Sequence, residues 1–264
     1  MSHIRGYIDK INRHNKKALA VFLTAGYPNI KDFVTLSKEI LQAGADIFEI
    51  GIPFSDPIAD GPVIQRSSQI ALEQGVDLQL SLELCEQIQK SSDKPVILMG
   101  YANPIIKYGI VRFIEDAKNS GVSGLIIPDV PLEEFDDFWG SYNHDIDIIL
   151  LTTPTSSAER IKKIDARSSG FVYCVSLTGT TGVIDIFTST VSKNLQRTYK
   201  LIKNNKMLVG FGISKPSDII KFAPFCDGVI VGSAVIKRIM EDQTRLYQGT
   251  IDLIRKLSRA CLMR

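Results

Sequence analysis

The segment that decides the fold is ADIFEIGIPFSDPIADGP, residues 45–62, together with NIKDFVTLSKEILQAG, residues 29–44, directly before it. Residues 29–44 place their apolar side chains on one helical stripe and end at Gly44, a residue type that often follows a helix. Residues 45–51, ADIFEIG, form a short apolar run, which is typical of a strand buried on both faces of a parallel sheet. A helix followed by a buried strand is the repeating unit of a parallel α/β fold.

The same unit recurs along the chain. Eight strand candidates lie at 18–24, 45–51, 95–101, 124–129, 145–151, 170–176, 206–212 and 227–233. Amphipathic segments that predict helices include 29–44, 76–93, 109–121, 156–165, 190–204 and 214–224. Eight strand–helix repeats in 264 residues predict an α/β fold, a single (β/α)8 TIM barrel that forms one domain over residues 1–264. A doubly wound sheet is the alternative, but the first turn, TAGYPN (24–29), lacks the GxGxxG pattern that such folds often carry.

Both ends of the chain predict helices outside these repeats. Residues 1–16, MSHIRGYIDKINRHNK, predict an extra N-terminal helix at the bottom of the barrel. Residues 241–264 predict one long closing helix with a basic outer face, and a solvated helix face is the expected role of those basic residues.

Composition and charge exclude several classes of function. The 31 basic and 29 acidic residues are interspersed, with a net charge of +2, which gives no case for nucleic-acid binding. The four cysteines match no zinc-binding spacing and are typical of a reducing compartment. The N-terminus lacks the apolar core of a signal peptide, and no apolar run approaches the roughly 18 residues of a membrane span. The sequence therefore predicts a cytoplasmic protein with no metal site and no membrane contact.

Glu49 is the first candidate for chemistry. Alternation along ADIFEIG places Ile47 and Glu49 on one face of the strand and Phe48 and Ile50 on the other. The bulky apolar pair is expected to face the helices, so Glu49 points into the mouth of the barrel, where active sites of this fold lie. A structural ion pair is the alternative, but the strand interiors carry no basic residue. A buried carboxyl group with a raised pKa is suited to general acid–base catalysis.

Asp60 is the second candidate. It lies in the loop IPFSDPIADGP (52–62), where three prolines restrict the backbone and reduce the entropy lost on ordering. A stiff loop over a barrel mouth can present a side chain to a ligand and exclude water. Asp56 and Asp60 can equally serve as turn residues, with Asp60 preceding the start of a helix.

Glycines in the last three strand-to-helix loops form a third candidate site. The loops read SLTGTTG (176–182), GFGIS (210–214) and VGSAV (231–235). Many barrels bind phosphate at the loops after strands seven and eight through backbone N–H groups and a helix N-terminus. A phosphate site is predicted there, although tight turns at strand ends also favour glycine. The residues expected to form it are Gly182, Gly212, Gly232 and Ser233.

Aromatic and apolar residues on the strands suggest a pocket for a planar ring. Phe22, Tyr101, Ile126 and Tyr173 have a parity that allows them to face inward, and core packing explains each of them equally well. Together these features predict a barrel enzyme with a phosphate end, an apolar end and two carboxylates between them.

Six stretches of the chain resemble one known family, the α subunit of tryptophan synthase. The match extends over nearly the whole chain, in the same order and with comparable spacing, and the run from Glu49 to Pro62 is its most specific part. The stretches are EIGIPFSDPIADGP (49–62), AVFLTAGYP (20–28), MGYANP (99–104), PDVPLEE (128–134), TGTTG (178–182) and VGFGIS (209–214).

The resemblance implies a lyase of tryptophan biosynthesis that cleaves indole-3-glycerol phosphate to indole and glyceraldehyde 3-phosphate by a retro-aldol reaction. Glu49 matches the catalytic glutamate, a general acid toward C3 of the indole ring. Asp60 matches the catalytic aspartate, which binds the indole N–H and stabilises positive charge on the ring. Substrate-binding positions of the family match Phe22, Tyr101, Tyr173, Thr181, Gly182, Phe211, Gly212, Gly232 and Ser233.

The resemblance also implies a partner. The family works with a β subunit that uses pyridoxal phosphate, in an α2β2 heterotetramer, and indole passes directly to that subunit. No cofactor is therefore expected in this chain. The surfaces that meet the partner match Phe54, Asp56, Pro57, Asn103 and Pro104. One departure is Leu177, where some relatives carry arginine; it concerns loop closure and leaves both carboxylates in place.

Two other functions are compatible with such a barrel. A sugar-phosphate epimerase would be expected to carry metal-binding histidines, and an indole-glycerol-phosphate synthase a catalytic lysine at a strand end; neither feature is found at the predicted strand ends. A non-catalytic subunit that binds an indole-like phosphate ligand and only activates its partner is the other alternative. Such a subunit would not need both Glu49 and Asp60.

Overall fold

The structure is a computed structural model that describes residues 2–140, 145–176, 187–210, 212–242 and 247–263. Its strands are β1 (Ala18–Thr24), β2 (Ile47–Gly51), β3 (Val96–Met99), β4 (Gly124–Ile126), β5 (Asp147–Ile148), β6 (Leu151–Thr152), β7 (Phe171–Val175), β8 (Lys206–Gly210) and β9 (Gly228–Val231). Its α-helices are α1 (His3–Arg13), α2 (Ile30–Gln42), α3 (Pro62–Glu73), α4 (Leu78–Gln89), α5 (Ala102–Tyr108), α6 (Ile110–Asn119), α7 (Phe135–Trp139), α8 (Ala158–Arg167), α9 (Ser189–Leu201), α10 (Pro216–Phe222), α11 (Ser233–Glu241) and α12 (Gln248–Ala260). Two 3-10 turns, η1 (Leu132–Glu134) and η2 (Ala223–Phe225), follow β4 and α10.

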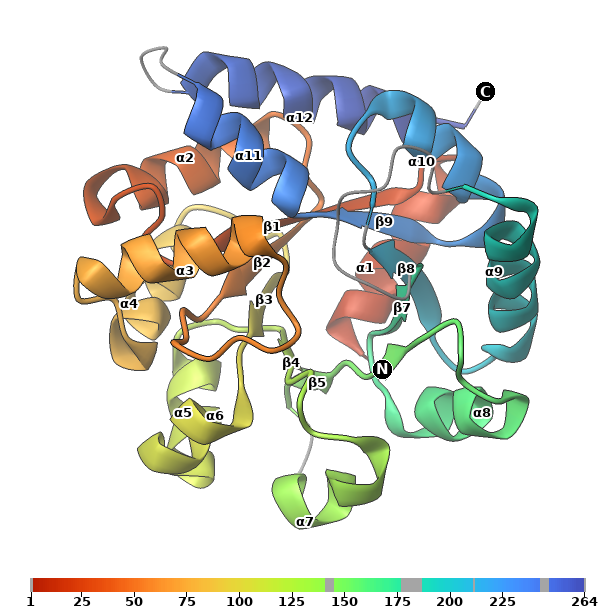
Figure 1. Ribbon diagram of the computed structural model, residues 1–264, viewed down its shortest axis with the longest axis horizontal. Coiled ribbons are helices and arrows are strands. Elements are labelled where there is room, and N and C mark those ends of the chain that lie inside the picture. Colours follow the sequence, from red (N-terminus) through yellow and green to blue (C-terminus); the bar gives the residue numbers. More distant parts are fainter. Residues whose placement is uncertain (1, 141–144, 177–186, 211, 243–246, 264) are drawn as a thin grey trace.

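The strands form one parallel sheet that curls into a barrel with the helices around it (Figure 1). The strand order is β5-β4-β3-β2-β1-β9-β8-β7-β6. The TIM-barrel prediction is confirmed. One strand differs from expectation: the run predicted at 145–151 is divided into β5 and β6, which flank Ile149 and Leu150. β5 pairs with β4 and β6 pairs with β7, so the chain between the two short strands closes the barrel.

Serine side chains hold this closure. The N–H of Ile148 donates to Oγ of Ser169 at 2.8 Å, and the N–H of Leu150 donates to Oγ of Ser168 at 3.2 Å. The Ser169 N–H donates in return to the Ile148 carbonyl oxygen at 2.9 Å. Ile148 and Leu150 are buried, so water does not replace these bonds. The hydroxyl groups substitute for the regular ladder where the strand is interrupted.

Replacing Ser169 with alanine is expected to lower the free energy of unfolding by about 1–3 kcal/mol, because it leaves the buried N–H of Ile148 without its acceptor. Urea denaturation of the variant and the parent measures the difference. Ser189→Ala, at an exposed position, is the matched control and should change stability by less than about 0.5 kcal/mol. Equal losses in both variants would contradict a special role for this closure.

The N-terminal helix α1 lies across one end of the barrel (Figure 1), which confirms the predicted extra helix. Ile4 and Ile8 are fully buried. A Cβ atom added to Gly124, the first residue of β4, would lie 2.7 Å from Cδ1 of Ile4, so the helix meets the amino ends of the strands. The interior residues that form one cluster with the two isoleucines are Ala18, Ala20, Ile47, Ile97, Ile126, Ile149, Phe171, Tyr173, Leu208 and Ile230.

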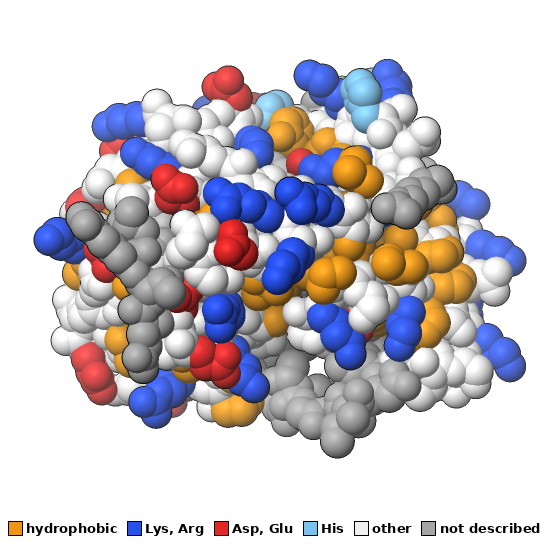
Figure 2. Space-filling model, turned by 90° about the horizontal axis from the view of Figure 1, so that it is seen from above, with side chains coloured by type: hydrophobic (Ala, Val, Ile, Leu, Met, Phe, Trp, Pro, Cys, Tyr) orange, Lys and Arg blue, Asp and Glu red, His pale blue; other side chains and the backbone are white. Residues whose placement is uncertain are grey.

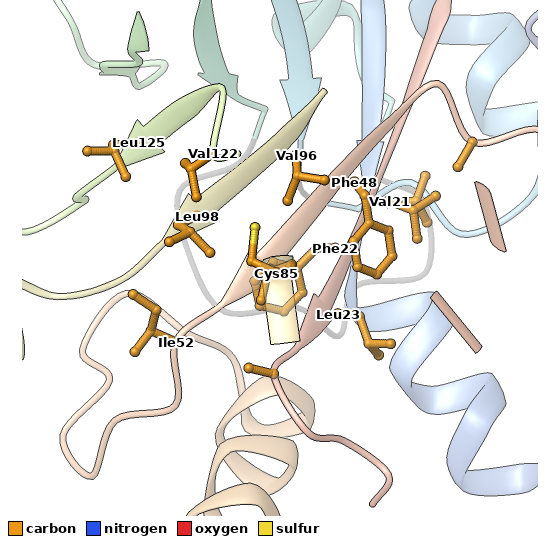
Figure 3. Packing of buried hydrophobic residues seen from close by; sticks show 14 of the residues in the cluster. Val21, Phe22, Leu23, Phe48, Ile52, Cys85, Val96, Leu98, Val122 and Leu125 are labelled. Atoms are coloured by element: carbon orange, nitrogen blue, oxygen red, sulfur yellow. The ribbon is translucent and has the colours of Figure 1, made fainter. Parts of the chain in front are cut away.

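A second and larger apolar cluster lies between the barrel and the helices. Figure 3 shows Phe48 of β2 and Val96 and Leu98 of β3 near Cys85 of α4. Ile47 belongs to the inner cluster, whereas Phe48 and Ile50 belong to the outer one. The predicted alternation along β2 is therefore confirmed, and the inner face of that strand presents residue 49 to the barrel.

Helices are present at all six predicted places, 29–44, 76–93, 109–121, 156–165, 190–204 and 214–224, with bounds that differ by a few residues; α8, for example, begins and ends two residues later than predicted. The C-terminal prediction was too long: α11 ends at Glu241 and α12 covers only Gln248–Ala260. Arg255, Lys256 and Arg259 of α12 are exposed, as expected. Figure 2 shows basic side chains with acidic ones among them on the face that carries the C-terminal helices. No helix among the described residues is long and apolar enough to span a membrane.

Candidate active site

Glu49 lies on the inner face of β2, beside Phe22 of β1 and Ile97 of β3 in the parallel register. Its side chain is buried, with the residue only 1% exposed, and Oε2 has no hydrogen-bond partner. Burial, and to a lesser degree the nearby negative charge of Asp60, raise its pKa to about 8. The carboxyl group is therefore mostly protonated at neutral pH. Its pKa is close enough to neutral pH for the group both to give and to take a proton.

Asp60 lies at the end of the β2–α3 loop, immediately before Gly61 caps α3. Its N–H donates to the Pro57 carbonyl oxygen at 3.0 Å, and its Oδ2 accepts a hydrogen bond from the Tyr101 hydroxyl at 3.0 Å. Burial raises the pKa of Asp60 to about 6, while the hydrogen bond from Tyr101 opposes that rise. Asp60 is thus mostly ionised at neutral pH, whereas Glu49 is not, and this difference gives the two carboxyl groups different chemical roles.

Glu49 and Asp60 line the same cavity at the carboxyl ends of the strands. Its empty volume is about 570 Å³, which includes space open to solvent. One part of its wall is apolar, and the predicted Phe22 and Tyr173 belong to the wall. The sequence analysis missed Gly61, Ile64, Met99, Ile213 and Ile230, which also line the cavity.

Glycines and a helix N-terminus bound another part of the cavity. Gly212, Gly232 and Ser233 line it, as predicted, and Ser233 is the first residue of α11. Gly212 has φ of +83°, a conformation that other residues rarely adopt. The first N–H groups of a helix lack partners within the helix and attract anions, so this end of the cavity is suited to a phosphate group.

Two further glycines make space for aromatic side chains. A Cβ atom on Gly51 would lie 2.4 Å from Cζ of Phe22, and a Cβ atom on Gly210 would lie 2.2 Å from the Tyr173 hydroxyl oxygen. Such distances are too short for real contacts, so only glycine leaves room for these rings at the cavity wall. In the sequence, each of these glycines ends an apolar run that predicts a strand. The ring that needs the space belongs to a neighbouring strand, so the sequence alone does not indicate which ring it is.

Some predicted residues take a different place from the one expected. Tyr101 follows β3 rather than ending it, and its hydroxyl group makes hydrogen bonds with Asp60 and with the N–H of Ala59. Ile126 packs in the inner apolar cluster, which favours the core interpretation. Thr181, Gly182 and Phe211, together with Leu177, lie outside the described residues.

The predicted partner-contact residues gather on the outside of the barrel mouth. One groove is lined by Phe54, Asp56 and Pro57, and a second by Phe54, Asn103 and Pro104. We call these two adjoining grooves the outer face. Ile58, which is 83% exposed, belongs to the first groove.

The fold and the cavity define a (β/α)8-barrel enzyme with two carboxyl groups in a cavity at the carboxyl ends of the strands. Within the described parts of the chain, no three histidine, cysteine, aspartate or glutamate side chains are grouped as a metal site would require. The family model described as tryptophan synthase alpha chain matches residues 8–260. The chain belongs to the tryptophan synthase alpha chain family.

Individual relatives agree with this assignment. The tryptophan synthase alpha chain of Caldanaerobacter subterraneus is 43% identical over 246 residues, which cover 93% of each chain. A crystal structure of tryptophan synthase subunit alpha from Legionella pneumophila has a TM-score of 0.86 at 35% identity and covers 99% of this chain and 98% of the other. A crystal structure of tryptophan synthase from M. tuberculosis in an aminoacrylate-bound form has a TM-score of 0.86 at 30% identity, covering 99% of this chain and 100% of that one.

Proposed function

We propose that this chain cleaves indole-3-glycerol phosphate to indole and glyceraldehyde 3-phosphate by a retro-aldol reaction. The observation that carries the proposal is Glu49, a buried carboxyl group whose Oε2 has no partner and which shares a cavity with Asp60. Burying such a group without a partner costs stability, and proteins keep it where chemistry requires it. Membership in the tryptophan synthase alpha chain family supports this substrate and this reaction class.

The two carboxyl groups divide the reaction between them. Glu49, protonated because of its raised pKa, donates its proton to C3 of the indole ring. Asp60, ionised at neutral pH, accepts the indole N–H and stabilises the positive charge that the ring then carries. The Glu49 carboxylate next takes the proton of the glycerol hydroxyl group. The bond between C3 and the glycerol carbon breaks, its electron pair returns to the ring, and the hydroxyl-bearing carbon becomes the aldehyde. Glu49 ends the cycle protonated, as it began.

The remaining cavity residues bind and orient the substrate in this proposal. The indole ring lies against the apolar wall, where Phe22 and Tyr173 are held by the space that Gly51 and Gly210 leave. The phosphate lies at the opposite end, where backbone N–H groups of the first turn of α11 neutralise it. Thr181, Gly182 and Phe211 would complete the site from the residues outside the described ranges.

The family implies a β chain as partner, and pyridoxal phosphate belongs to that chain. An α2β2 assembly and a docking site on the outer face are the finer parts of our proposal. The exposed Ile58 and the half-buried Phe54 support this surface, because both present apolar side chains from the same loop that carries Asp60.

The test is indole release from indole-3-glycerol phosphate by the chain alone and with a β chain of the family added. Slow release by the chain alone, accelerated by the partner, is the expected result. An absence of release under both conditions, with the phosphate ligand still bound, would contradict the catalytic proposal. That outcome would favour the alternative, a non-catalytic subunit that binds an indole-like phosphate.

A further inference from the structure

Phe54 lies in the same loop as Asp60 and connects the outer face to Tyr101. Its ring lies 5.3 Å from the ring of Tyr101, centroid to centroid, with an angle of 31° between the planes. Phe54 is half-buried and lines both grooves of the outer face. Tyr101 in turn donates its hydroxyl hydrogen to Oδ2 of Asp60 at 3.0 Å. One pair of stacked rings therefore joins the outer surface to a carboxyl group that lines the cavity.

The backbone of Tyr101 is anchored independently of Phe54. Tyr101 is the residue before α5, and the next N–H, that of Ala102, donates to both carboxyl oxygens of Asp129 at 3.0 and 3.1 Å. The hydroxyl oxygen of Tyr101 also accepts the N–H of Ala59 at 3.1 Å. Since the main chain is held in place, a change at Phe54 acts on the tilt of the Tyr101 ring and on the position of its hydroxyl group rather than on the backbone.

We propose that Phe54 is a positioning residue, which holds the Tyr101 ring so that the Tyr101 hydroxyl group fixes Asp60. The inference rests on the proposed role of Asp60 in the reaction. Aromatic pairs at this separation attract each other beyond the area that they bury, and the attraction depends on the orientation of the rings, so the contact favours one orientation of the Tyr101 ring.

The pKa of Asp60 depends on the charged and titratable groups around it, so a change in the Tyr101 hydrogen bond can be measured as a change in that pKa. Glu49 faces the same cavity from β2, Tyr173 from β7, and Tyr101 lies between Asp60 and Asp129. The hydrogen bond from Tyr101 favours the ionised form of Asp60. A weaker bond raises the pKa of Asp60, so the acidic side of the pH–rate profile moves to higher pH.

The experiment measures the steady-state rate of indole release by the isolated chain, from pH 5 to pH 9, for Phe54→Ala. We expect kcat to fall about tenfold with KM little changed, because Asp60 is misplaced while the phosphate end is intact. The acidic limb should move up by about one pH unit, the equivalent of a hydrogen bond worth roughly 1.4 kcal/mol. Omitting the β chain keeps loss of partner binding out of the measurement.

Three further variants make the result specific. Phe54→Tyr keeps an aromatic ring and should restore the parent pH profile. Val111→Ala, at an exposed apolar position on α6, should have no effect. In the Tyr101→Phe background, which lacks the hydroxyl group, Phe54→Ala should cause little further loss, because the two changes act through one bond.

A parent-like pH profile in Phe54→Ala, or fully additive losses in the double variant, would overturn the positioning role. If Phe54→Ala does not fold, Phe54→Leu, which keeps apolar volume without a ring, decides between the same two results. Failure of the parent chain to release indole is a different outcome, because it contradicts the proposed function rather than this link.

Discussion

Replacing Glu49 with glutamine is expected to reduce indole release by at least about a thousandfold, because an amide neither donates a proton to the ring nor takes one from the glycerol hydroxyl group. The side chain keeps its size in a position that is only 1% exposed, so the cavity keeps its shape. Binding of a non-cleavable indolyl-alkyl phosphate should persist, since the phosphate end, at Gly232 and Ser233, is untouched. Single-turnover rates and the affinity for that ligand, measured side by side, give both quantities.

Glu86→Gln is the matched control, because it makes the same chemical change on an exposed helix face where Glu86 pairs with Lys90. Turnover of this variant should equal that of the parent chain. Retained turnover in Glu49→Gln would remove this residue from the mechanism. Loss of turnover together with loss of ligand binding would show a damaged cavity instead, and Glu49→Asp would then separate chemistry from shape.

The largest expected effect on stability also comes from Glu49. Its pKa is raised from 4.5 to about 8 in the folded chain, so between these two pH values the folded state holds a proton that the unfolded state has lost. The stabilisation is complete below about pH 4.5 and is lost as the pH rises through 8. Asp60, with its pKa raised from 3.8 to about 6, adds a change of the same sign at lower pH.

Glu49→Gln should therefore flatten the pH dependence of the free energy of unfolding and be more stable than the parent at pH 8.5. The difference between pH 5 and pH 8.5 is expected to shrink by on the order of 4 kcal/mol, since each of the roughly three pH units between pH 5 and the folded-state pKa corresponds to about 1.4 kcal/mol. Urea denaturation at both pH values, for the variant, the parent and Glu86→Gln, measures it. If the free energy of unfolding changed equally with pH in all three proteins, the raised pKa of Glu49 would be contradicted. Burial also raises the pKa of each of the four cysteine thiols to about 11 or 12, but the parent and both variants share these thiols, so their contribution cancels in the comparison.

Local pattern was sufficient for most of the barrel. Parallel strands covered on both faces need short apolar runs, so β1, β2 and β8 could be located from composition alone. Period-two alternation also identified the inner face of β2, and with it the direction of Glu49. The run at 145–151 could not be divided in advance, because its interruption depends on Ser168 and Ser169, which lie beyond the following helix.

For the site, the sequence by itself determined which residue types stand at the strand ends: a carboxylate on β2, a second one in a proline-restricted loop, and glycines before α11. These are consequences of chain order and of the side-chain period of a strand, which are local properties. Only the tertiary structure decided that Gly51 makes room for Phe22, that the Tyr101 hydroxyl holds Asp60, and that Phe54 lies on Tyr101. Those contacts join side chains from separate elements, and their existence depends on packing distances that no local pattern contains.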